Sequence, residues 1–406
     1  MAAPGQGARA SSHDAVTAHT LPGAIRLASL PPLSLYVHFP WCVQKCPYCD
    51  FNSHAVDDAA PIPEERYIDA LVHDLELSLP LVWGRRVHSV FFGGGTPSLL
   101  SANGFDRLIS EIRARLALEA DAEITLEANP GTFEAAKFEA FRNSGANRLS
   151  IGIQSFNSAH LKALGRTHDG QEAIKAVHIA TELFDNFNLD LMYALPGQVP
   201  AQLQADLDTA LGFNPPHLSY YHLTLETNTV FAKYPPPLPD DDAAAEMQMM
   251  IEARLGAAGY EHYETSAYAR PDRRSRHNIN YWRFGDYLGI GAGAHGKLSF
   301  AQRILRTAKL RNPESYMAGC EADAPLAEER EVGVAELPFE FMMNALRLTG
   351  GFEVREFGER TGLAISATDQ ALNEAERKGL ITRDHLRIKP TERGRRFLND
   401  LLQLFL

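Results

Sequence analysis

Hydrophobic runs rich in β-forming residues alternate with helix-like segments along the first half of this chain. We predict strands over residues 35–38, 87–92, 124–126, 149–151, 189–192 and 218–221. Helices are predicted between them, including residues 66–77, 105–116 and 170–183. Strands that alternate with helices form parallel βαβ units. The pattern predicts an α/β fold with a partial (β/α)6 barrel, and an open doubly wound sheet is the alternative that periodicity alone leaves open.

Composition divides the chain into four segments. Residues 1–30 are rich in Ala, Gly, Ser and Pro, which predicts a disordered leader. The barrel is predicted over residues 31–235, ending in a proline-rich run, and a barrel extension follows over residues 236–336. Predicted helices, two short strands and a last helix then favour a winged-helix-like α+β module over residues 337–406.

The overall charge limits the classes of partner. The 51 Asp and Glu residues outnumber the 39 Lys and Arg residues, which gives a formal net charge of -12. Binding to nucleic acid needs a basic surface, so we expect no nucleic-acid partner. No run approaches the ~20 apolar residues of a membrane-spanning helix, and residues 1–30 make a poor signal peptide. We therefore expect a cytoplasmic protein, with peripheral membrane contact left open.

Three of the four cysteines are clustered. Cys42, Cys46 and Cys49 have the spacing C-x3-C-x2-C on a loop after the first predicted strand, whereas Cys320 is remote. Clustered thiols in a cytosolic chain indicate a metal site rather than disulfides. Thiolates are the usual ligands of a [4Fe-4S] cluster, and three of them leave one iron with an open position. Zinc is the alternative, and His54 is the candidate for the fourth ligand it would need.

Glycine and polar residues mark the ends of the later predicted strands. Glycines at residues 93–95, followed by Thr96, end the second strand and let the backbone approach a ligand closely. Glu127 closes the third strand, Gln154 closes the fourth with Arg166 beyond it, and Asp190 lies in the fifth. Ligand chemistry in barrels gathers at the carboxyl ends of strands. These residues therefore predict one polar pocket.

The cysteine loop and the glycine run together resemble the radical S-adenosylmethionine (SAM) superfamily. Over residues 33–400 the chain is similar to the oxygen-independent coproporphyrinogen oxidase family within it. The resemblance implies a [4Fe-4S] cluster on Cys42, Cys46 and Cys49. It also implies SAM-binding positions at Tyr36, Tyr48, Gly94, Gly95, Thr96, Glu127, Gln154, Arg166 and Asp190. In these roles a carboxylate suits the SAM ammonium, and Arg166 suits its carboxylate.

Two features distinguish members of that family. The oxidases carry a further cysteine two residues after the third ligand, where this chain has Phe51. Residues 277–282 match H-N-x-x-Y-W, which resembles the HemW-type haem chaperones. Imidazole is an axial ligand for haem iron, and nearby aromatic rings can stack on a porphyrin. His277 is therefore the predicted haem ligand, with His295 as a second candidate.

Two hypotheses about function follow from the resemblance. In the first, the chain is a haem chaperone that passes haem to apo-haemoproteins, including respiratory membrane complexes, with a homodimer as a possible form. In the second, it is a radical SAM enzyme that decarboxylates coproporphyrinogen III in porphyrin biosynthesis. The substitution at Phe51 and the H-N-x-x-Y-W segment favour the first. A haem-degrading methyltransferase-like relative is a third possibility that shares the cysteine loop.

Overall fold

Six parallel strands form the centre of the computed structural model, which describes residues 25–56, 61–132 and 134–406. They are β1 (Leu33–Phe39), β4 (Arg86–Gly94), β5 (Ala117–Ala128), β6 (Arg148–Gln154), β7 (Phe187–Tyr193) and β8 (His217–His222). Each strand pairs with the next in chain order. A doubly wound sheet would instead reverse its order at a switch point. The predicted partial barrel is confirmed, and the doubly wound alternative is wrong.

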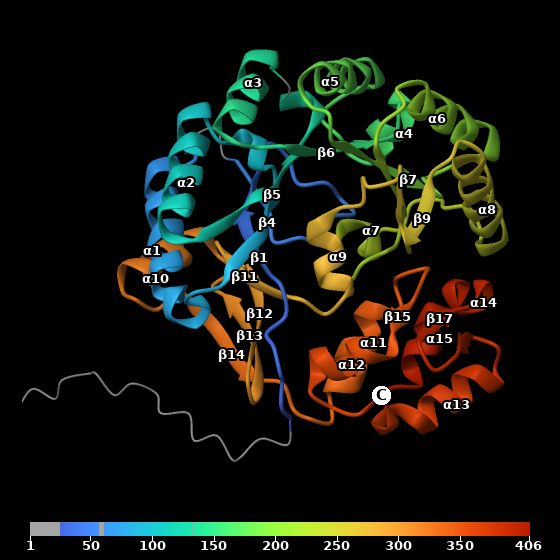
Figure 1. Ribbon diagram of the computed structural model, residues 1–406. Coiled ribbons are helices and arrows are strands. Elements are labelled where there is room, and N and C mark those ends of the chain that lie inside the picture. The colour runs from blue at the N-terminus through green and yellow to red at the C-terminus, as the bar shows by residue number, and fades with distance from the viewer. Residues whose placement is uncertain (1–24, 57–60, 133) are drawn as a thin grey trace, which may run out of the picture.

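Helices cover the outside of this curved sheet, as Figure 1 shows. They are α1 (Glu64–Val82), α2 (Ala102–Arg115), α3 (Ala135–Ser144), α5 (Gly170–Leu183), α6 (Pro200–Gly212) and α8 (Asp241–Ala257). Helix α5 begins at a capping box, in which the Asp169 side chain accepts from the Glu172 amide and the Glu172 side chain accepts from the Asp169 amide. Such a box satisfies amides that a helix N-terminus leaves free.

Residues after the barrel add strands to both edges of the same sheet. The edge at β1 gains β11 (Asp286–Ile290), β12 (His295–Phe300), β13 (Arg303–Lys309) and β14 (Leu326–Glu331). The edge at β8 gains β10 (Ala267–Ala269) and then β9 (Glu261–Glu264). Strand β11 runs parallel to β1, whereas β12, β13 and β14 continue antiparallel. The predicted extension thus becomes part of the sheet rather than a separate layer.

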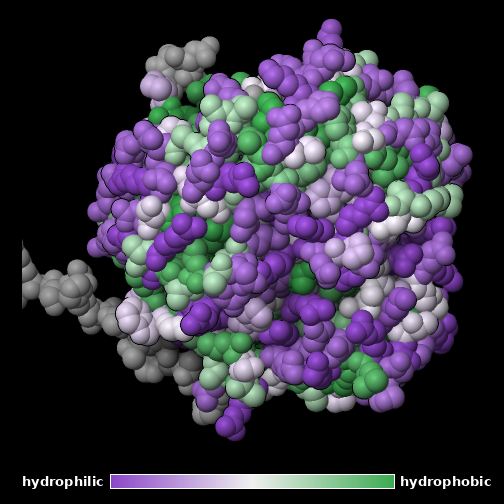
Figure 2. Space-filling model, turned by 45° about the horizontal axis from the view of Figure 1, so that its top comes forward, coloured by the Kyte–Doolittle hydropathy of each residue, from purple (hydrophilic) through white to green (hydrophobic). Residues whose placement is uncertain are grey.

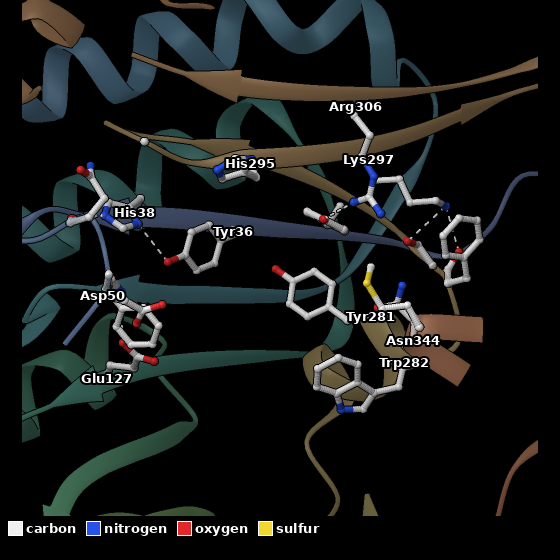
Figure 3. Close-up of a pocket in the computed structure, with 18 of the residues that line it drawn as sticks. Tyr36, His38, Asp50, Glu127, Tyr281, Trp282, His295, Lys297, Arg306 and Asn344 are labelled. Atoms are coloured by element: carbon white, nitrogen blue, oxygen red, sulfur yellow. Dashed lines mark hydrogen bonds between the residues drawn. The ribbon is translucent and has the colours of Figure 1, made fainter. Parts of the chain in front are cut away.

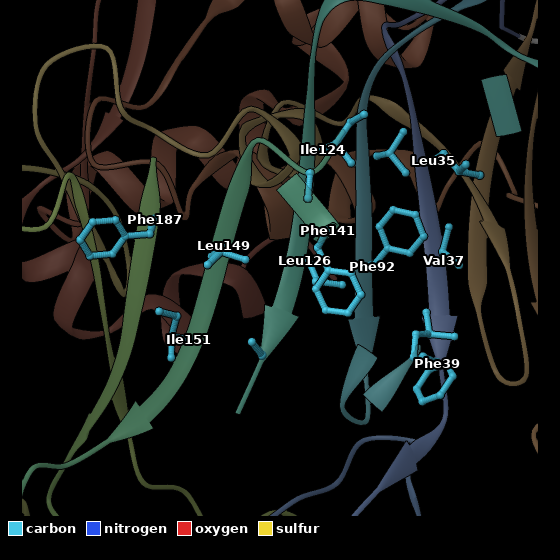
Figure 4. Packing of buried hydrophobic residues seen from close by; sticks show 14 of the residues in the cluster. Leu35, Val37, Phe39, Phe92, Ile124, Leu126, Phe141, Leu149, Ile151 and Phe187 are labelled. Carbon is cyan, nitrogen blue, oxygen red and sulfur yellow. The ribbon is translucent and has the colours of Figure 1, made fainter. Parts of the chain in front are cut away.

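The main hydrophobic core lies between the strands and the outer helices. Side chains alternate along β1: Leu35 and Val37 are buried in this core, whereas Tyr36 lines a cavity on the other side. Figure 4 shows Leu35 and Val37 beside Phe92 of β4 and Leu126 of β5. Alternation of this kind is expected in a barrel, where one face of each strand packs on helices and the other faces inward.

A second core holds the C-terminal module together. Its elements are α11 (Leu337–Ala345), β15 (Phe352–Glu353), α12 (Val354–Thr361), α13 (Asp369–Arg377), β16 (Ile381–Arg383), β17 (Arg387–Pro390), α14 (Glu392–Arg396) and α15 (Leu398–Gln403). Strand β15 joins the predicted hairpin in a small sheet of order β15-β17-β16. Ile25 and Leu27 are buried in this second core, so the predicted leader is packed from residue 25 onward. Residues 1–24 lie outside the described part of the chain.

The remaining described elements are short. They are β2 (Trp41–Cys42), β3 (His54–Ala55), α4 (Ser158–Ala163), α7 (Val230–Lys233), α9 (Arg276–Trp282), α10 (Pro313–Glu321) and 3-10 turns at Pro97–Leu99, Pro130–Thr132 and Ile365–Thr368. Within residues 25–56, 61–132 and 134–406, no helix is both long and apolar enough to cross a membrane. Hydrophilic side chains cover most of the face drawn in Figure 2.

Candidate cofactor cavity

A cavity of about 660 Å³ opens where the parallel strands end. The loop of residues 42–53 and the inward-facing residues of β5 to β8 line it. Cys42, Cys46 and Cys49 all lie on its wall, as do all the residues predicted to bind SAM except Tyr36. The structure therefore brings the predicted cluster ligands and the predicted SAM-binding residues to one place.

Local hydrogen bonds fold the cysteine loop over the cavity. Strand β2 pairs with β3, which brings the two ends of the loop together. The Cys49 amide donates to the Cys46 carbonyl at 3.1 Å, and the Lys45 ammonium donates to the Phe51 and Ser53 carbonyls at 3.0 and 3.1 Å. These bonds close the loop tightly, so that its thiols face inward.

The partial burial of the three cysteine thiols is consistent with a metal site. Burial raises the pKa of the Cys42 and Cys49 thiols, and the neighbouring thiols raise it further. A bound cation reverses this effect, because it stabilises the thiolate. Among the described residues, no group of three His, Cys, Asp or Glu side chains lies close enough together to hold a single metal ion. A [4Fe-4S] cluster makes a different demand, since each thiolate binds its own iron. His54 is not among the residues that line the cavity.

Two buried carboxylates, Glu127 and Asp190, face the cavity. Burial and the nearby Asp190 carboxylate raise the pKa of Glu127 to about 8. Burial likewise raises the pKa of Asp190, which accepts hydrogen bonds from Ser150 at 2.9 Å and Asn188 at 2.8 Å. Neither carboxylate forms an ion pair with a described residue. A cationic ligand such as SAM would compensate this pair.

Arg166 places a positive charge on the wall of the same cavity. Its Nη1 lies 3.7 Å from the Cys46 sulfur, and its Nη2 donates to the Gly152 carbonyl at 2.8 Å and to Asn129. Its buried Nε has no hydrogen-bond partner among the described residues. Gln154 next to it ends β6 with a φ of 65°, an uncommon backbone conformation for a residue other than glycine. Arg166 can therefore pair with a ligand carboxylate.

Close packing explains the glycine run after β4. A Cβ on Gly95 would lie 2.5 Å from the Trp41 carbonyl oxygen, and one on Gly94 would overlap the His38 ring. The amides of Gly94, Gly95 and Thr96 already donate to Glu127, Phe39 and Trp41 respectively. The glycines let β4 approach β1 and the cysteine loop, and a direct contact of this run with SAM stays a prediction.

The cavity also contains polar residues that were not predicted from the sequence. They are Arg148 and Ser150 on β6, Asn188 on β7, and His217 and Ser219 on β8. Asn188 is the centre of this group, because its side chain bonds to Ser150 at 2.8 Å, to His217 at 2.7 Å and to Ser219 at 3.1 Å. Each lies two residues from another polar residue on a hydrophobic strand. That alternation is the signal that would have identified them.

Comparison with known proteins decides the family. Residues 36–210 match the model of the radical SAM superfamily, and residues 334–397 match that of the HemN C-terminal domain. The chain is 50% identical over 384 residues to the heme chaperone HemW of Escherichia coli (strain K12), covering 94% of this chain and 100% of that protein. It is 32% identical over 380 residues to the heme chaperone HemW of Bacillus subtilis (strain 168), covering 92% and 99%. The chain belongs to the HemW family.

The coproporphyrinogen III oxidase HemN from Escherichia coli, described as a radical SAM enzyme, has the same fold as this member of the HemW family. The two structures superpose with a TM-score of 0.79 over 93% of this chain and 90% of HemN, at 24% sequence identity. A match at this identity supports the fold alone.

The H-N-x-x-Y-W segment of this HemW-family chain forms helix α9. His277 is buried, with its Nδ1 3.1 Å from the Ser89 hydroxyl and its Nε2 2.9 Å from the Tyr281 hydroxyl. Its ring stacks on Phe91 at 4.9 Å between centroids, and burial lowers its pKa to about 3. His277 lines neither the cofactor cavity nor the second cavity beside it. Binding to haem iron, which stays a prediction, would first require breaking one of these hydrogen bonds.

A second cavity of about 520 Å³ adjoins the first. Asp50, Phe51, Glu127, Tyr281 and Trp282 line both cavities, so the two cavities share a wall. Tyr36, the one predicted SAM residue missing from the first cavity, lines the second. There its hydroxyl lies 3.0 Å from Nδ1 of His38, the hydrogen bond drawn in Figure 3.

Proposed function

We propose that this chain is a haem chaperone, which holds a [4Fe-4S] cluster and SAM, binds haem and delivers it to haem-requiring proteins. The observation that carries the proposal is the similarity to proteins named heme chaperone HemW along essentially their whole length. Similarity that includes the barrel, the extension and the C-terminal module favours a shared function over a shared barrel alone.

The residues of the cofactor cavity have distinct proposed roles. Cys42, Cys46 and Cys49 bind the cluster, which when present supplies one-electron chemistry and an open iron position. The Glu127 and Asp190 carboxylates balance the positive charges of SAM, and Arg166 pairs with its carboxylate. The loop of residues 42–53 covers the site and limits access of water. Tyr48, Gly94, Gly95, Thr96 and Gln154 complete the wall.

The proposed acceptors are apo-haemoproteins, with respiratory membrane complexes among them. Delivery then takes place in the cytoplasm or through transient contact with a membrane-bound acceptor. A homodimer is one form that we propose for the chain, and light scattering of the cluster-loaded chain measures the oligomeric state directly.

Phe51 argues against the alternative function, which is oxidative decarboxylation of coproporphyrinogen III. Where the oxidases carry a further cysteine, the side chain of Phe51 is 59% exposed and lies on the wall of both cavities. An exposed aromatic ring offers a porphyrin a face to stack on but no thiol.

Anaerobically reconstituted full-length chain with SAM and dithionite tests the proposal. One sample receives haem and another coproporphyrinogen III, and the Soret band, 5'-deoxyadenosine and protoporphyrinogen are measured. We expect saturable haem binding and no decarboxylated product. The Cys49→Ser variant is the control that lacks a cluster ligand. Protoporphyrinogen formed over many turnovers by the wild type and not by this control would establish the oxidase instead.

A further inference from the structure

The second cavity has the size and wall of a ligand site. Its volume of about 520 Å³ falls within the range of ~300–1,000 Å³ that is typical of small-molecule pockets. Tyr281 and Trp282 of α9 form one side, and Phe51 and Met343 contribute further apolar surface. Figure 3 shows His295 and Arg306 of the β12–β13 hairpin facing the two aromatic rings of α9. The cavity therefore has aromatic rings on one side and basic side chains on the other.

Strand alternation gathers the basic groups on one face of that hairpin. His295 and Lys297 are two residues apart on β12, so their side chains share a face. Arg306 of β13 is the partner of Lys297 across the ladder, and it lies on the same face. Arg311 follows shortly after β13 and also lines the cavity. Four basic residues therefore border one side of the cavity.

These groups differ in whether they already have partners. Lys297 is buried and pairs with Asp286 at 3.0 Å, and Arg306 pairs with Glu340 and donates to the Tyr287 hydroxyl at 2.5 Å. The guanidinium of Arg311 is exposed and forms no ion pair with any described residue. Arg311 is thus available to an external carboxylate.

The histidines near the cavity differ in the same way. His38 lines the cavity, but its Nδ1 is 3.0 Å from the Tyr36 hydroxyl and its Nε2 is 2.8 Å from the Asn52 carbonyl. Both nitrogens of the buried His277 are also hydrogen-bonded. His295 is exposed, and in the described part of the chain neither of its ring nitrogens has a hydrogen-bond partner. The cavity wall shields the His295 ring partly from water, and this shielding together with the neighbouring Arg306 and Arg311 lowers its pKa, which favours the neutral imidazole that binds metals.

We propose that the second cavity is the haem site, in which His295 binds the iron, Tyr281 and Trp282 contact the porphyrin face, and Arg311 pairs with a propionate. The inference rests on the proposed function, since it specifies where the haem of a haem chaperone is held. The exposed position of His295 and Arg311 leaves one edge of the ligand accessible, as delivery to an acceptor requires.

Asn52 links this site to the cluster loop. Its side-chain amide donates to the Ala292 carbonyl at 2.8 Å and to the Arg311 carbonyl at 2.9 Å. The backbone carbonyl of Asn52 accepts a hydrogen bond from Nε2 of His38 at 2.8 Å. The loop that carries the three cysteines therefore contacts the backbone of Arg311 and the segment before His295. Ordering of the loop by a bound cluster would also order this wall of the haem site.

The test is titration of full-length variants with three probes: ferric haem, haem dimethyl ester and metal-free protoporphyrin IX. His295→Ala should weaken ferric haem binding by roughly ten-fold or more and change the Soret spectrum. The same variant should bind metal-free protoporphyrin IX as the wild type does, because only the iron bond is lost. Arg311→Ala should weaken binding of haem about two- to five-fold, as for an exposed ion pair, and leave the dimethyl ester unaffected.

Matched controls replace exposed residues of the C-terminal module. His385→Ala and Arg377→Ala should leave all three titrations unchanged, and thermal unfolding confirms that each variant is folded. An unchanged Soret spectrum and haem affinity in His295→Ala would overturn the assignment, as would a loss confined to His277→Ala. A folded wild type that binds no haem at all would instead overturn the proposed function.

Discussion

Nε2 of His277 lies 2.9 Å from the hydroxyl oxygen of Tyr281, one turn further along α9. The histidine and the tyrosine of the H-N-x-x-Y-W segment are thus hydrogen-bonded to each other. The other ring nitrogen, Nδ1, lies 3.1 Å from the Ser89 hydroxyl oxygen. The segment fixes α9 against β4 and holds Tyr281 and Trp282 at the wall of both cavities. A structural role accounts for this histidine in the conformation described.

Replacing His277 therefore tests stability before it tests ligation. We expect His277→Ala to destabilise the fold by about 2–3 kcal/mol, because it leaves a cavity and removes a hydrogen-bond partner of the Tyr281 hydroxyl. Urea unfolding of the apo chain measures this free energy. The exposed His385→Ala is the control and should change it by less than about 0.5 kcal/mol. Unchanged stability combined with lost haem binding would restore His277 as the haem ligand.

The cysteines should separate cleanly into two groups. Replacing Cys42, Cys46 or Cys49 by Ser should abolish the iron and sulfide content of the reconstituted chain, since each is a proposed ligand. Cys320 is buried in α10 and lines neither cavity. Cys320→Ala should therefore keep its cluster and cost about 1 kcal/mol of stability. Full iron content in any one of the three serine variants would remove that cysteine from the ligand set.

The pKa of Glu127 predicts a pH dependence of SAM binding. Because this pKa is about 8, the side chain is mostly neutral at pH 7 when no ligand is bound. A cation binds the ionised carboxylate better, so SAM affinity should rise from pH 7 to pH 9. Glu127→Gln should weaken SAM binding roughly ten-fold at pH 9 and flatten the profile. A profile that is the same in both proteins would exclude Glu127 as the group responsible.

The same shift predicts how Glu127 affects stability. Its pKa in the folded chain lies above the ordinary value of 4.5, so the folded state holds the proton more tightly than the unfolded state does. The resulting stabilisation is complete below about pH 4.5 and is lost as the pH rises through about 8. Glu127→Gln should therefore gain stability relative to the wild type between pH 6 and pH 9 in urea unfolding. A difference that does not change with pH would contradict the assigned shift.

Two cations on the wall of the second cavity should differ in their effect on folding. Lys297 is buried against Asp286 at 3.0 Å and lies over the Phe284 ring, so Lys297→Met should cost about 3 kcal/mol. Arg311 has no ion pair within the described chain, so Arg311→Ala should change stability by less than about 0.5 kcal/mol. Urea unfolding of both variants tests this contrast, which equal losses would contradict.

The fold was largely predictable because hydrophobic periodicity reports local structure. The predicted helix at residues 170–183 coincides with α5, and each predicted barrel strand lies within an observed one. The alternation predicts a helix after each strand, but no residue ranges were predicted for helices α3 and α6, whose apolar faces are weak. Strand β11 also could not be predicted, because its place next to β1 depends on pairing between residues about 250 positions apart.

The residues of the cofactor site were predictable where sequence motifs mark them. They were less predictable where tertiary packing determines which side chains reach a cavity. The cysteine loop, Glu127, Arg166 and Asp190 converge on one cavity as the motifs predict. The accessibility of a histidine is different, because it depends on which neighbours fold against it. The sequence favours His277 over His295 as the haem ligand, but of these two only His295 lines a cavity with both ring nitrogens unpaired in the described structure.

Haem transfer is the most direct test of the central claim. The chain is loaded with haem anaerobically, freed of excess ligand and mixed with a haem-requiring enzyme in its apo form, and recovery of that enzyme's activity is followed over time. Haem-loaded serum albumin at the same concentration controls for passive release. We expect faster recovery from the haem-loaded chain than from albumin, with a matching loss of the chain's Soret band. Recovery no faster than from albumin would contradict a role in haem delivery.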